Sequence, residues 1–333
     1  MRSGEIRRVA AALGRTVVET STLAGGFSHE TCLLTLTDGQ VVARFGGGDP
    51  AIEAAVMTAA GGQVPVPRVL TVLPSGPAAE NGRPGMVLEY VAGTPLSRVL
   101  ADGSITATSM GDLGAEVGRV VAGIGAVRFG HPGFFIDEHL SVGPERPWSQ
   151  QLGEVAETCM AATAEARLDQ ATRRAWVSLC ASHAPALARI DEQARLVHAD
   201  INPKNILVTR TRGGWRVDAV LDWEFGYSGC PYGDAANMVR FGTGYPAGFV
   251  DGFCRAFAEH QPADLPLAEE WSYLGRVLDM FALSDLVTRP AGHPVAEQAA
   301  EQIRLWVGQG VPSAGPGRHA GSTTAPRPRR RSP

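Results

Sequence analysis

One short stretch of this chain, VHADINPKNILV, constrains the fold more than any other, because it places chemically useful side chains between two apolar runs. It contains His198, Asp200 and Asn205, and the later stretch AVLDWEFG adds Asp222. Lone His or Asp residues near a strand are usually structural. Four such residues in this order are more specific, and they indicate one site rather than four unrelated turns.

The segment between Asn205 and Asp222 has the pattern of a β-hairpin. Residues 206–209 and 215–221 are rich in apolar and β-branched side chains, and Gly213 and Gly214 lie between the two runs. Two such runs joined by a glycine turn predict paired antiparallel strands. The hairpin is therefore expected to return Asp222 to the side of the loop that carries Asp200.

A carboxylate beside further oxygen ligands suits phosphoryl transfer. That reaction needs a carboxylate to orient the attacking hydroxyl group, and oxygen ligands to hold Mg²⁺ on the transferring phosphates. Asp200 and Asn205 lie five residues apart on a short loop, so one can face an acceptor while the other faces a metal ion. A chance H-x-D in a turn is the alternative interpretation, which Asn205 and Asp222 disfavour.

This stretch resembles the catalytic and metal-binding segments of the aminoglycoside phosphotransferase family, relatives of choline kinase and, more distantly, of protein kinases. The resemblance implies that Asp200 is the catalytic base and that His198 supports the loop. It also implies that Asn205 and Asp222 bind Mg²⁺, and that ATP or GTP is the phosphoryl donor. A eukaryotic-type protein kinase is disfavoured, because the chain has no G-x-G-x-x-G loop, no D-F-G and no later A-P-E.

The first hundred residues predict a helix followed by a β-rich region. Residues 5–14 have helical periodicity, and strands are expected at 17–23, 31–37 and 41–45, with a hairpin turn at Asp38 and Gly39. Another helix is expected around Glu53, in AIEAAVMTAAG. This order of elements is typical of the amino-terminal lobe of the same family.

The resemblance assigns nucleotide-binding roles within this region. Arg44 is expected to pair with nucleotide phosphates and to be held by Glu53; the alternative for Arg44 is a solvent-facing position. The connector GMVLEYVAGTPL is expected to contact the nucleobase through the main chain. The expected phosphate loop and connector contacts are Gly25, Gly26, Phe27, Ser28, Glu89, Tyr90 and Val91.

The resulting prediction is an α+β, bilobal protein-kinase-like fold, with a small β-rich N-terminal lobe and a larger, mainly helical C-terminal lobe. The N-terminal nucleotide-binding lobe is placed at residues 1–91 and the catalytic and acceptor-binding lobe at 92–309. Residues 310–333 are rich in Pro, Gly, Ser and Arg and are expected to be a disordered tail. A solvated tail is favoured over a nucleic-acid contact, and no nucleic-acid partner is expected.

Composition and charge limit the remaining choices. The five cysteines have no C-x-x-C spacing, and no apolar run approaches the roughly 20 residues that span a bilayer. We therefore expect a cytoplasmic protein without a membrane anchor, disulfide framework or zinc site. The net charge is −4, and the five arginines after Gly310 leave −9 for the rest, which favours a cationic substrate weakly.

The segment after Asp222, GYSGCPYGDAANMVRF, departs from the family pattern at one position. Cys230 stands where the family commonly has an aspartate, so no role is assigned to that position. Asp234 is expected to cap the following helix and to brace the catalytic loop.

The acceptor is expected to be a hydroxylated small molecule bound by acidic side chains of the C-terminal lobe. An aminoglycoside or similar antibiotic leads, with phosphorylation conferring resistance; a nucleoside or peptide antibiotic, or a metabolite such as homoserine, choline or an amino sugar, are the alternatives. An inactive nucleotide-binding scaffold is the alternative of a different class. The sequence leaves the oligomeric state open. The acidic candidates, each of which taken alone is more often a surface acid than a ligand, are Glu259, Glu269, Glu270, Asp279 and Asp285.

Overall fold

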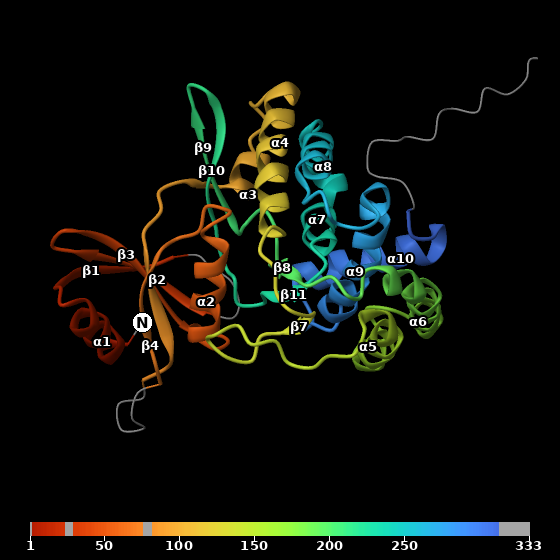
Figure 1. Cartoon of the computed structure of the whole chain (residues 1–333), viewed down its shortest axis with the longest axis horizontal. Helices are drawn as coiled ribbons and strands as arrows, with labels where there is room; N and C mark the ends of the chain where they lie inside the picture. The colour runs from red at the N-terminus through yellow and green to blue at the C-terminus, as the bar shows by residue number, and fades with distance from the viewer. Residues whose placement is uncertain (1, 24–28, 76–81, 313–333) are drawn as a thin grey trace, which may run out of the picture.

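The computed structural model describes residues 2–23, 29–75 and 82–312. A β-rich N-terminal part lies beside a larger helical part (Figure 1). Helix α1 (Ser3–Leu13) packs on the N-terminal sheet through Val9. The expected tail and the expected phosphate loop at Gly25, Gly26, Phe27 and Ser28 lie largely or wholly outside the described residues.

The N-terminal sheet is antiparallel, with five strands in the order β1-β2-β3-β5-β4. In β2, every second residue from Cys32 to Leu36 is buried, as expected for a strand with one face on a core. The strands expected at the start of the chain are present, with small shifts at their ends. The five strands are β1 (Val17–Thr22), β2 (His29–Leu36), β3 (Gly39–Gly46), β4 (Val69–Leu73) and β5 (Gly85–Glu89).

Helix α2 (Pro50–Ala60) lies between this sheet and the helical part (Figure 1). Asp49 caps it by accepting a hydrogen bond from Ala51 N at 2.8 Å, and Pro50 suits the first turn, where no intrahelical donor is needed. Glu53, Val56 and Met57 are buried on its inner face. The charged side chain of Glu53 is therefore directed into the interior.

Two small antiparallel sheets position the site. One has the order β10-β9-β6 and the other β7-β11-β8. The chain passes from β8 through residues 198–205 to β9, returns along β10, and reaches β11 through residues 221–226. Both site segments therefore lie between the same two sheets. The strands are β6 (Thr94–Pro95), β7 (Gly133–Phe134), β8 (Arg195–Val197), β9 (Ile206–Thr211), β10 (Gly214–Val220) and β11 (Tyr227–Gly229).

In the helical part, α4 and α8 pack closely against each other. A Cβ on Gly114 would lie 2.1 Å from Phe249 O, and a Cβ on Gly252 would lie 2.1 Å from Gly111 O. Glycine at these contacts lets the two backbones approach. The helices of this part are α3 (Leu96–Leu100), α4 (Ala107–Ile124), α5 (Trp148–Ala162), α6 (Gln170–His183), α7 (Tyr232–Val239), α8 (Phe249–His260), α9 (Trp271–Leu286) and α10 (Pro294–Gln309), with short 3₁₀ helices η2 (Ala184–Arg189), η3 (Gly242–Gly244) and η4 (Ala268–Glu270).

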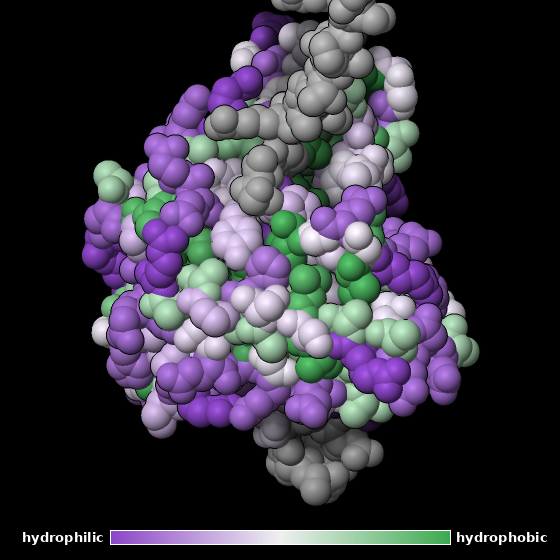
Figure 2. Space-filling view, turned by 90° about the vertical axis from the view of Figure 1, so that its right-hand side faces the viewer, coloured by the Kyte–Doolittle hydropathy of each residue, from purple (hydrophilic) through white to green (hydrophobic). Residues whose placement is uncertain are grey.

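The larger hydrophobic core extends across the two parts. Val56 and Met57 of α2 and Met86 of β5 belong to the same buried cluster as the C-terminal helices. This core therefore crosses the predicted lobe boundary between residues 91 and 92, and the boundary itself stays a prediction. At the end of the molecule where α6 and α10 lie, hydrophilic residues surround a few apolar ones (Figure 2). None of the described helices combines the length and apolar character needed to span a bilayer.

Candidate active site

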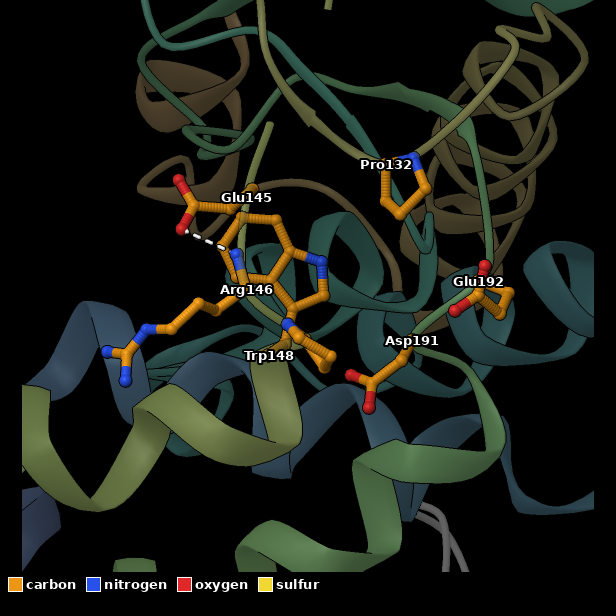
Figure 3. Close-up of a pocket in the computed structure, with 7 residues that line it drawn as sticks. Pro132, Glu145, Arg146, Trp148, Asp191 and Glu192 are labelled. Carbon is orange, nitrogen blue, oxygen red and sulfur yellow. Dashed lines mark hydrogen bonds between the residues drawn. The ribbon is translucent and has the colours of Figure 1, made fainter. Parts of the chain in front are cut away.

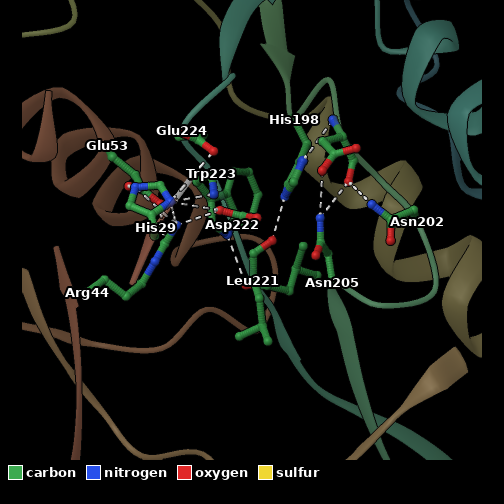
Figure 4. A network of polar contacts seen from close by, with 12 residues as sticks. His29, Arg44, Glu53, His198, Asn202, Asn205, Leu221, Asp222, Trp223 and Glu224 are labelled. Carbon is green, nitrogen blue, oxygen red and sulfur yellow. Dashed lines mark hydrogen bonds and ion pairs between the residues drawn. The ribbon is translucent and has the colours of Figure 1, made fainter. Parts of the chain in front are cut away.

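The loop between β8 and β9 holds Asp200 and Asn205 side by side. Asn205 Nδ2 donates to Asp200 Oδ2 at 2.9 Å and to the Asp200 main-chain oxygen at 3.0 Å. Asn202 Nδ2 donates to that same main-chain oxygen at 3.1 Å (Figure 4). Within the described chain, no hydrogen bond uses Asn205 Oδ1. The amide therefore orients the carboxylate and still offers its oxygen to another ligand.

Asp234 braces the loop from α7. Its two carboxylate oxygens accept hydrogen bonds from His198 N and Ala199 N, each at 2.9 Å. Ala199 has φ +68°, a left-handed conformation that is uncommon for a residue with a side chain. The expected bracing is confirmed. The expected capping role is wrong, because Asp234 lies inside the first turn of α7 and its carboxylate is used by the loop.

His198 joins the loop to the end of the hairpin. Its Nε2 donates to Leu221 O at 2.9 Å, and its Nδ1 accepts from Asp200 N at 3.2 Å. The ring is completely buried, and this burial lowers the pKa of His198 to about 4. His198 is therefore neutral at physiological pH and acts here as a fixed link between the loop and the residue before Asp222.

A second group of charged residues lies on the other side of Asp222 (Figure 4). Arg44 on β3 donates from Nη1 to Glu53 Oε1 at 2.6 Å and from Nη2 to Asp222 Oδ1 at 2.5 Å. The Glu53 oxygen also accepts from Trp223 N at 3.2 Å. The expected contact between Arg44 and Glu53 is confirmed, whereas the direct contact between Arg44 and Asp222 was not predicted.

Two further residues belong to this group and were missed in the sequence. His29 Nδ1 lies 2.9 Å from Arg44 Nη2, 3.6 Å from Glu224 Oε1 and 4.0 Å from Asp222 Oδ1. His29 begins β2 directly after the glycine-containing segment, and Glu224 follows Asp222 by two residues. The only signal in the sequence was that His29 directly follows Ser28 and that Glu224 lies two residues after Asp222. The residues that they contact come from distant segments, which sequence spacing does not reveal.

Burial and neighbouring charges shift the pKa values across the site. Burial raises the pKa of Asp200 to about 6, and the Asp222 carboxylate contributes to the increase. Burial alone would lower the pKa of Arg44, but the carboxylates of Glu53 and Asp222 outweigh it and raise that pKa. Burial, reinforced by the Arg44 charge, lowers the pKa of His29. Asp200 is thus a carboxylate near neutral pH that can still take up a proton.

The connector after β5 lies close to the hairpin. Glu89 ends β5, and its Oε1 accepts from Arg68 N at 2.9 Å, so this side chain is engaged within the protein. Tyr90 is 42% exposed, and Val91 follows it toward β6. A Cβ on Gly93 would lie 3.0 Å from Leu207 Cβ on β9. The connector therefore packs directly against β9 of the hairpin that leads to Asp222.

The structure does not bring the five acidic acceptor candidates together. Glu259 on α8 and Glu269 on η4 are exposed. Glu270 pairs with Arg189 at 2.7 Å and Asp285 with Arg289 at 2.9 Å. Asp279 is only 2% exposed and pairs with Arg240 at 2.5 Å. Three of the five carboxylates thus already have an arginine partner.

A small hollow at the start of α5 is separate from these groups (Figure 3). Its volume is about 50 Å³, far below the 300–1,000 Å³ that encloses a drug-sized ligand. Within it, Asp191 binds Ser149 N at 3.0 Å and Ser149 Oγ at 2.5 Å, which secures the first turn of α5. The hollow is lined by Pro132, Glu145, Arg146, Pro147, Trp148, Asp191 and Glu192.

A family model described as the phosphotransferase enzyme family matches residues 19–271. Among curated proteins, no sequence matches the chain significantly.

Solved structures of two aminoglycoside phosphotransferases are among those similar to the chain. A thermostable mutant of the aminoglycoside phosphotransferase APH(4)-Ia, in complex with ADP and hygromycin B, has a TM-score of 0.68 and 17% identity, over 93% of this chain and 100% of that chain. The GDP and kanamycin complex of APH(2″)-IIIa has a TM-score of 0.64 and 15% identity, over 90% of this chain and 96% of that chain. At these identities the likeness establishes the fold, and the expected α+β architecture is confirmed.

Proposed function

This chain belongs to the phosphotransferase enzyme family, and from that premise we propose that it transfers the γ-phosphoryl group of ATP or GTP to a hydroxyl group of an aminoglycoside or similar hydroxylated antibiotic. The enzyme class follows from the family. We propose in addition the acceptor, the donor and the roles of individual residues, with antibiotic resistance as the biological role.

The observation that carries the proposal is the Asp200 carboxylate held by Asn205. The acceptor hydroxyl would donate its hydrogen bond to Asp200, which orients the hydroxyl oxygen toward the γ-phosphorus and takes its proton as the P–O bond forms. The leaving nucleoside diphosphate keeps the bridging oxygen. With a pKa of about 6, Asp200 is ionised at neutral pH and basic enough to accept that proton.

The Arg44 group would serve the donor nucleotide. Arg44 is fixed through Nη1 by Glu53 and through Nη2 by Asp222, and its uncommitted N–H groups would bind phosphate oxygens. The main chain of Glu89, Tyr90 and Val91 would contact the base, and the segment Gly25, Gly26, Phe27 and Ser28 would approach the phosphates. Because main-chain contacts can serve either purine, the arrangement is compatible with both ATP and GTP.

The residues present also fit a magnesium ion. Asn205 Oδ1 is unused by hydrogen bonds within the described chain, and Asp222, held at φ +68°, commits only Oδ1 to Arg44 there. Carboxylate and amide oxygens are the ligands that Mg²⁺ prefers. Asn205 and Asp222 would therefore hold the ion, which when bound would neutralise charge on the donor phosphates.

The acceptor class rests on the relatives and on charge. Two of the similar structures contain hygromycin B and kanamycin, and an acidic protein surface would attract such polycations. Of the proposed acidic contacts, Glu259, Glu269 and Asp285 are exposed. Glu270, Asp279 and Asp285 would first have to leave their arginine partners.

The test is nucleotide turnover by the full chain with Mg²⁺, with ATP and GTP supplied separately, across a panel of hydroxylated antibiotics. We expect phosphorylation of at least one aminoglycoside and resistance to it in cells that express the chain, with Asp200→Asn inactive in both assays. Nucleotide binding without turnover on any acceptor, unchanged by Asp200→Asn, would instead identify an inactive nucleotide-binding scaffold.

A further inference from the structure

Large apolar side chains are exposed together beside the catalytic segments. Six large hydrophobic residues are exposed among those that the structure describes, and three of them come from two neighbouring segments. Phe134 on β7 is 50% exposed, and Ile136, two residues later, is 63% exposed. Phe225, between Asp222 and β11, is 48% exposed. Single exposed apolar residues are ordinary on a protein surface, whereas a contiguous group of them is typical of a binding site.

The strand register brings these three residues to one face. β7 and β11 pair antiparallel, with Phe134 opposite Tyr227. Continued by two residues, the same register puts Ile136 opposite Phe225. Alternate residues of a strand point to the same side, so the extended register directs Ile136 and Phe225 to the side of Phe134. Phe134, Ile136 and Phe225 thus form one apolar patch.

An aromatic cluster holds the apolar patch in place. The centre of the Phe134 ring lies 5.6 Å from those of Trp148 and Tyr227, and the Trp148 and Tyr227 rings lie 5.4 Å apart. Trp148 is only 8% exposed, so Phe134 is packed on one side and open to solvent on the other. Ile136 is also confined, because a Cβ on Gly143 would lie 3.0 Å from its Cγ2. A ligand would therefore meet side chains that lose little conformational freedom on binding.

The apolar patch adjoins the loop that carries Asp200. The small sheet has the order β7-β11-β8, and Asp200 follows three residues after Val197, the last residue of β8 (Figure 1). Adjacent strands lie about 4.8 Å apart, so β7 and β8 are separated by about 10 Å. Phe225 is also near the site along the chain, three residues after Asp222. A molecule of two or three linked rings is therefore long enough to cover the patch and present a hydroxyl group to Asp200.

We propose that the apolar patch binds the acceptor through the C–H face of one of its rings, while a hydroxyl group of a neighbouring ring reaches Asp200. The inference rests on the proposed phosphotransfer, because an acceptor whose hydroxyl contacts Asp200 must lie against the surface around that residue. Small-molecule sites are lined mainly by apolar and aromatic side chains, with a few polar groups that fix orientation. The acidic candidates are dispersed, and three of the five already have arginine partners. The patch therefore favours a hydroxylated antibiotic of linked sugar or cyclitol rings that is recognised by ring shape more than by charge.

The experiment is a calorimetric titration of the full chain with kanamycin and with hygromycin B, with ADP present so that no turnover occurs. Contact with the apolar patch predicts a negative heat-capacity change, and an affinity that falls less than about threefold from about 0.05 M to about 0.5 M NaCl. Binding by carboxylates alone predicts a fall of about tenfold or more for such polycations. Phe134→Ala and Phe225→Ala should each weaken binding by about tenfold, whereas Phe134→Tyr keeps the ring and should retain the affinity.

Leu305→Ala is the matched control, because Leu305 is a 41% exposed apolar residue on α10. It should leave both affinities unchanged. Equal effects of Leu305→Ala and Phe134→Ala, salt-sensitive binding that survives both phenylalanine substitutions, or no binding of either antibiotic would overturn the inference. Circular dichroism establishes that each variant is folded; if Phe134→Ala is not, Ile136→Ser, which removes no ring from the aromatic cluster, decides the question by the same titration.

The two proposals can fail separately. Binding that depends on the apolar patch without phosphorylation of either antibiotic would contradict only the proposed function. Phosphorylation combined with salt-sensitive binding that ignores the patch would contradict only this inference.

Discussion

The polar groups on the two sides of Asp222 are held in different ways. On one side, Asp200 and Asn205 belong to a single loop, and hydrogen bonds to main-chain atoms fix it. On the other side, Arg44 joins three segments of the chain mainly through charge. Several directional contacts hold the hydrogen-bonded loop, whereas the charge cluster depends on one guanidinium group shared by two carboxylates. The loop should therefore tolerate the loss of one contact better than the charge cluster tolerates the loss of its cation.

The largest effect is expected where charge alone maintains the arrangement. Arg44→Met leaves the buried carboxylates of Glu53 and Asp222 without their cation, so the free energy of unfolding should fall by about 3–5 kcal/mol, measured by urea denaturation. Adding Glu53→Gln to Arg44→Met should recover part of the loss. If Arg44→Met lowered the free energy of unfolding by less than about 1 kcal/mol, the Arg44 guanidinium would not be the main compensation for the Glu53 and Asp222 carboxylates.

Asp200→Asn tests the loop side. Removing a positioned general base should lower kcat by about 100-fold or more, equivalent to about 2.7 kcal/mol, with little change in stability. The measurement is steady-state turnover of an accepted antibiotic. Asp251→Asn, at an exposed position on α8, is the control that should retain full activity. Retention of activity within a few fold by Asp200→Asn would contradict the assigned role.

Asp234→Asn tests how the loop is held. An amide can accept only one of the two main-chain hydrogen bonds and presents its NH₂ group to the other donor, so the free energy of unfolding should fall by about 2 kcal/mol. Urea denaturation is the measurement. If the free energy of unfolding of Asp234→Asn were within about 0.5 kcal/mol of that of the wild type, Asp234 would not be the main support of the loop.

The pH dependence of turnover tests the protonation state that Asp200 needs. Asp200 must be ionised to accept a proton, and its raised pKa of about 6 keeps the inactive, protonated form populated at higher pH than for an ordinary carboxyl group. The rate should therefore fall as pH decreases through 6, by about tenfold between pH 7 and pH 5. The profile of kcat/KM from pH 5 to 8 is the measurement, with circular dichroism at pH 5 to establish folding. A flat profile down to pH 5 would remove Asp200 as the titrating base.

The smallest effect is expected at the exposed acids. Glu259→Gln and Glu269→Gln should each raise KM for a polycationic acceptor by less than about fivefold with kcat unchanged, because exposed ion pairs contribute about 0.2–1 kcal/mol. The same substitutions should not affect KM for the nucleotide. An increase above about tenfold would instead place the acceptor's main contacts at these residues.

Much of the Asp200 side was predictable from the sequence, because its geometry is local. Asp200 and Asn205 are five residues apart, and a glycine turn between β-rich runs returns the chain to Asp222. The bracing by Asp234 was also anticipated, but its position in α7 was not. Helix capping depends on where the helix begins, which sequence patterns define only to within a few residues.

The sequence by itself determined the order of the N-terminal elements, the β9–β10 hairpin and the pairing of Arg44 with Glu53, since each follows from periodicity, turn residues or the family resemblance. Only the tertiary structure decided that His29 and Glu224 lie against Asp222, and that Asp279 is buried with Arg240 while Glu259 is exposed. Packing of distant segments sets which charges are buried together. Electrostatic interactions depend on that burial and distance, and neither quantity is encoded in residue spacing.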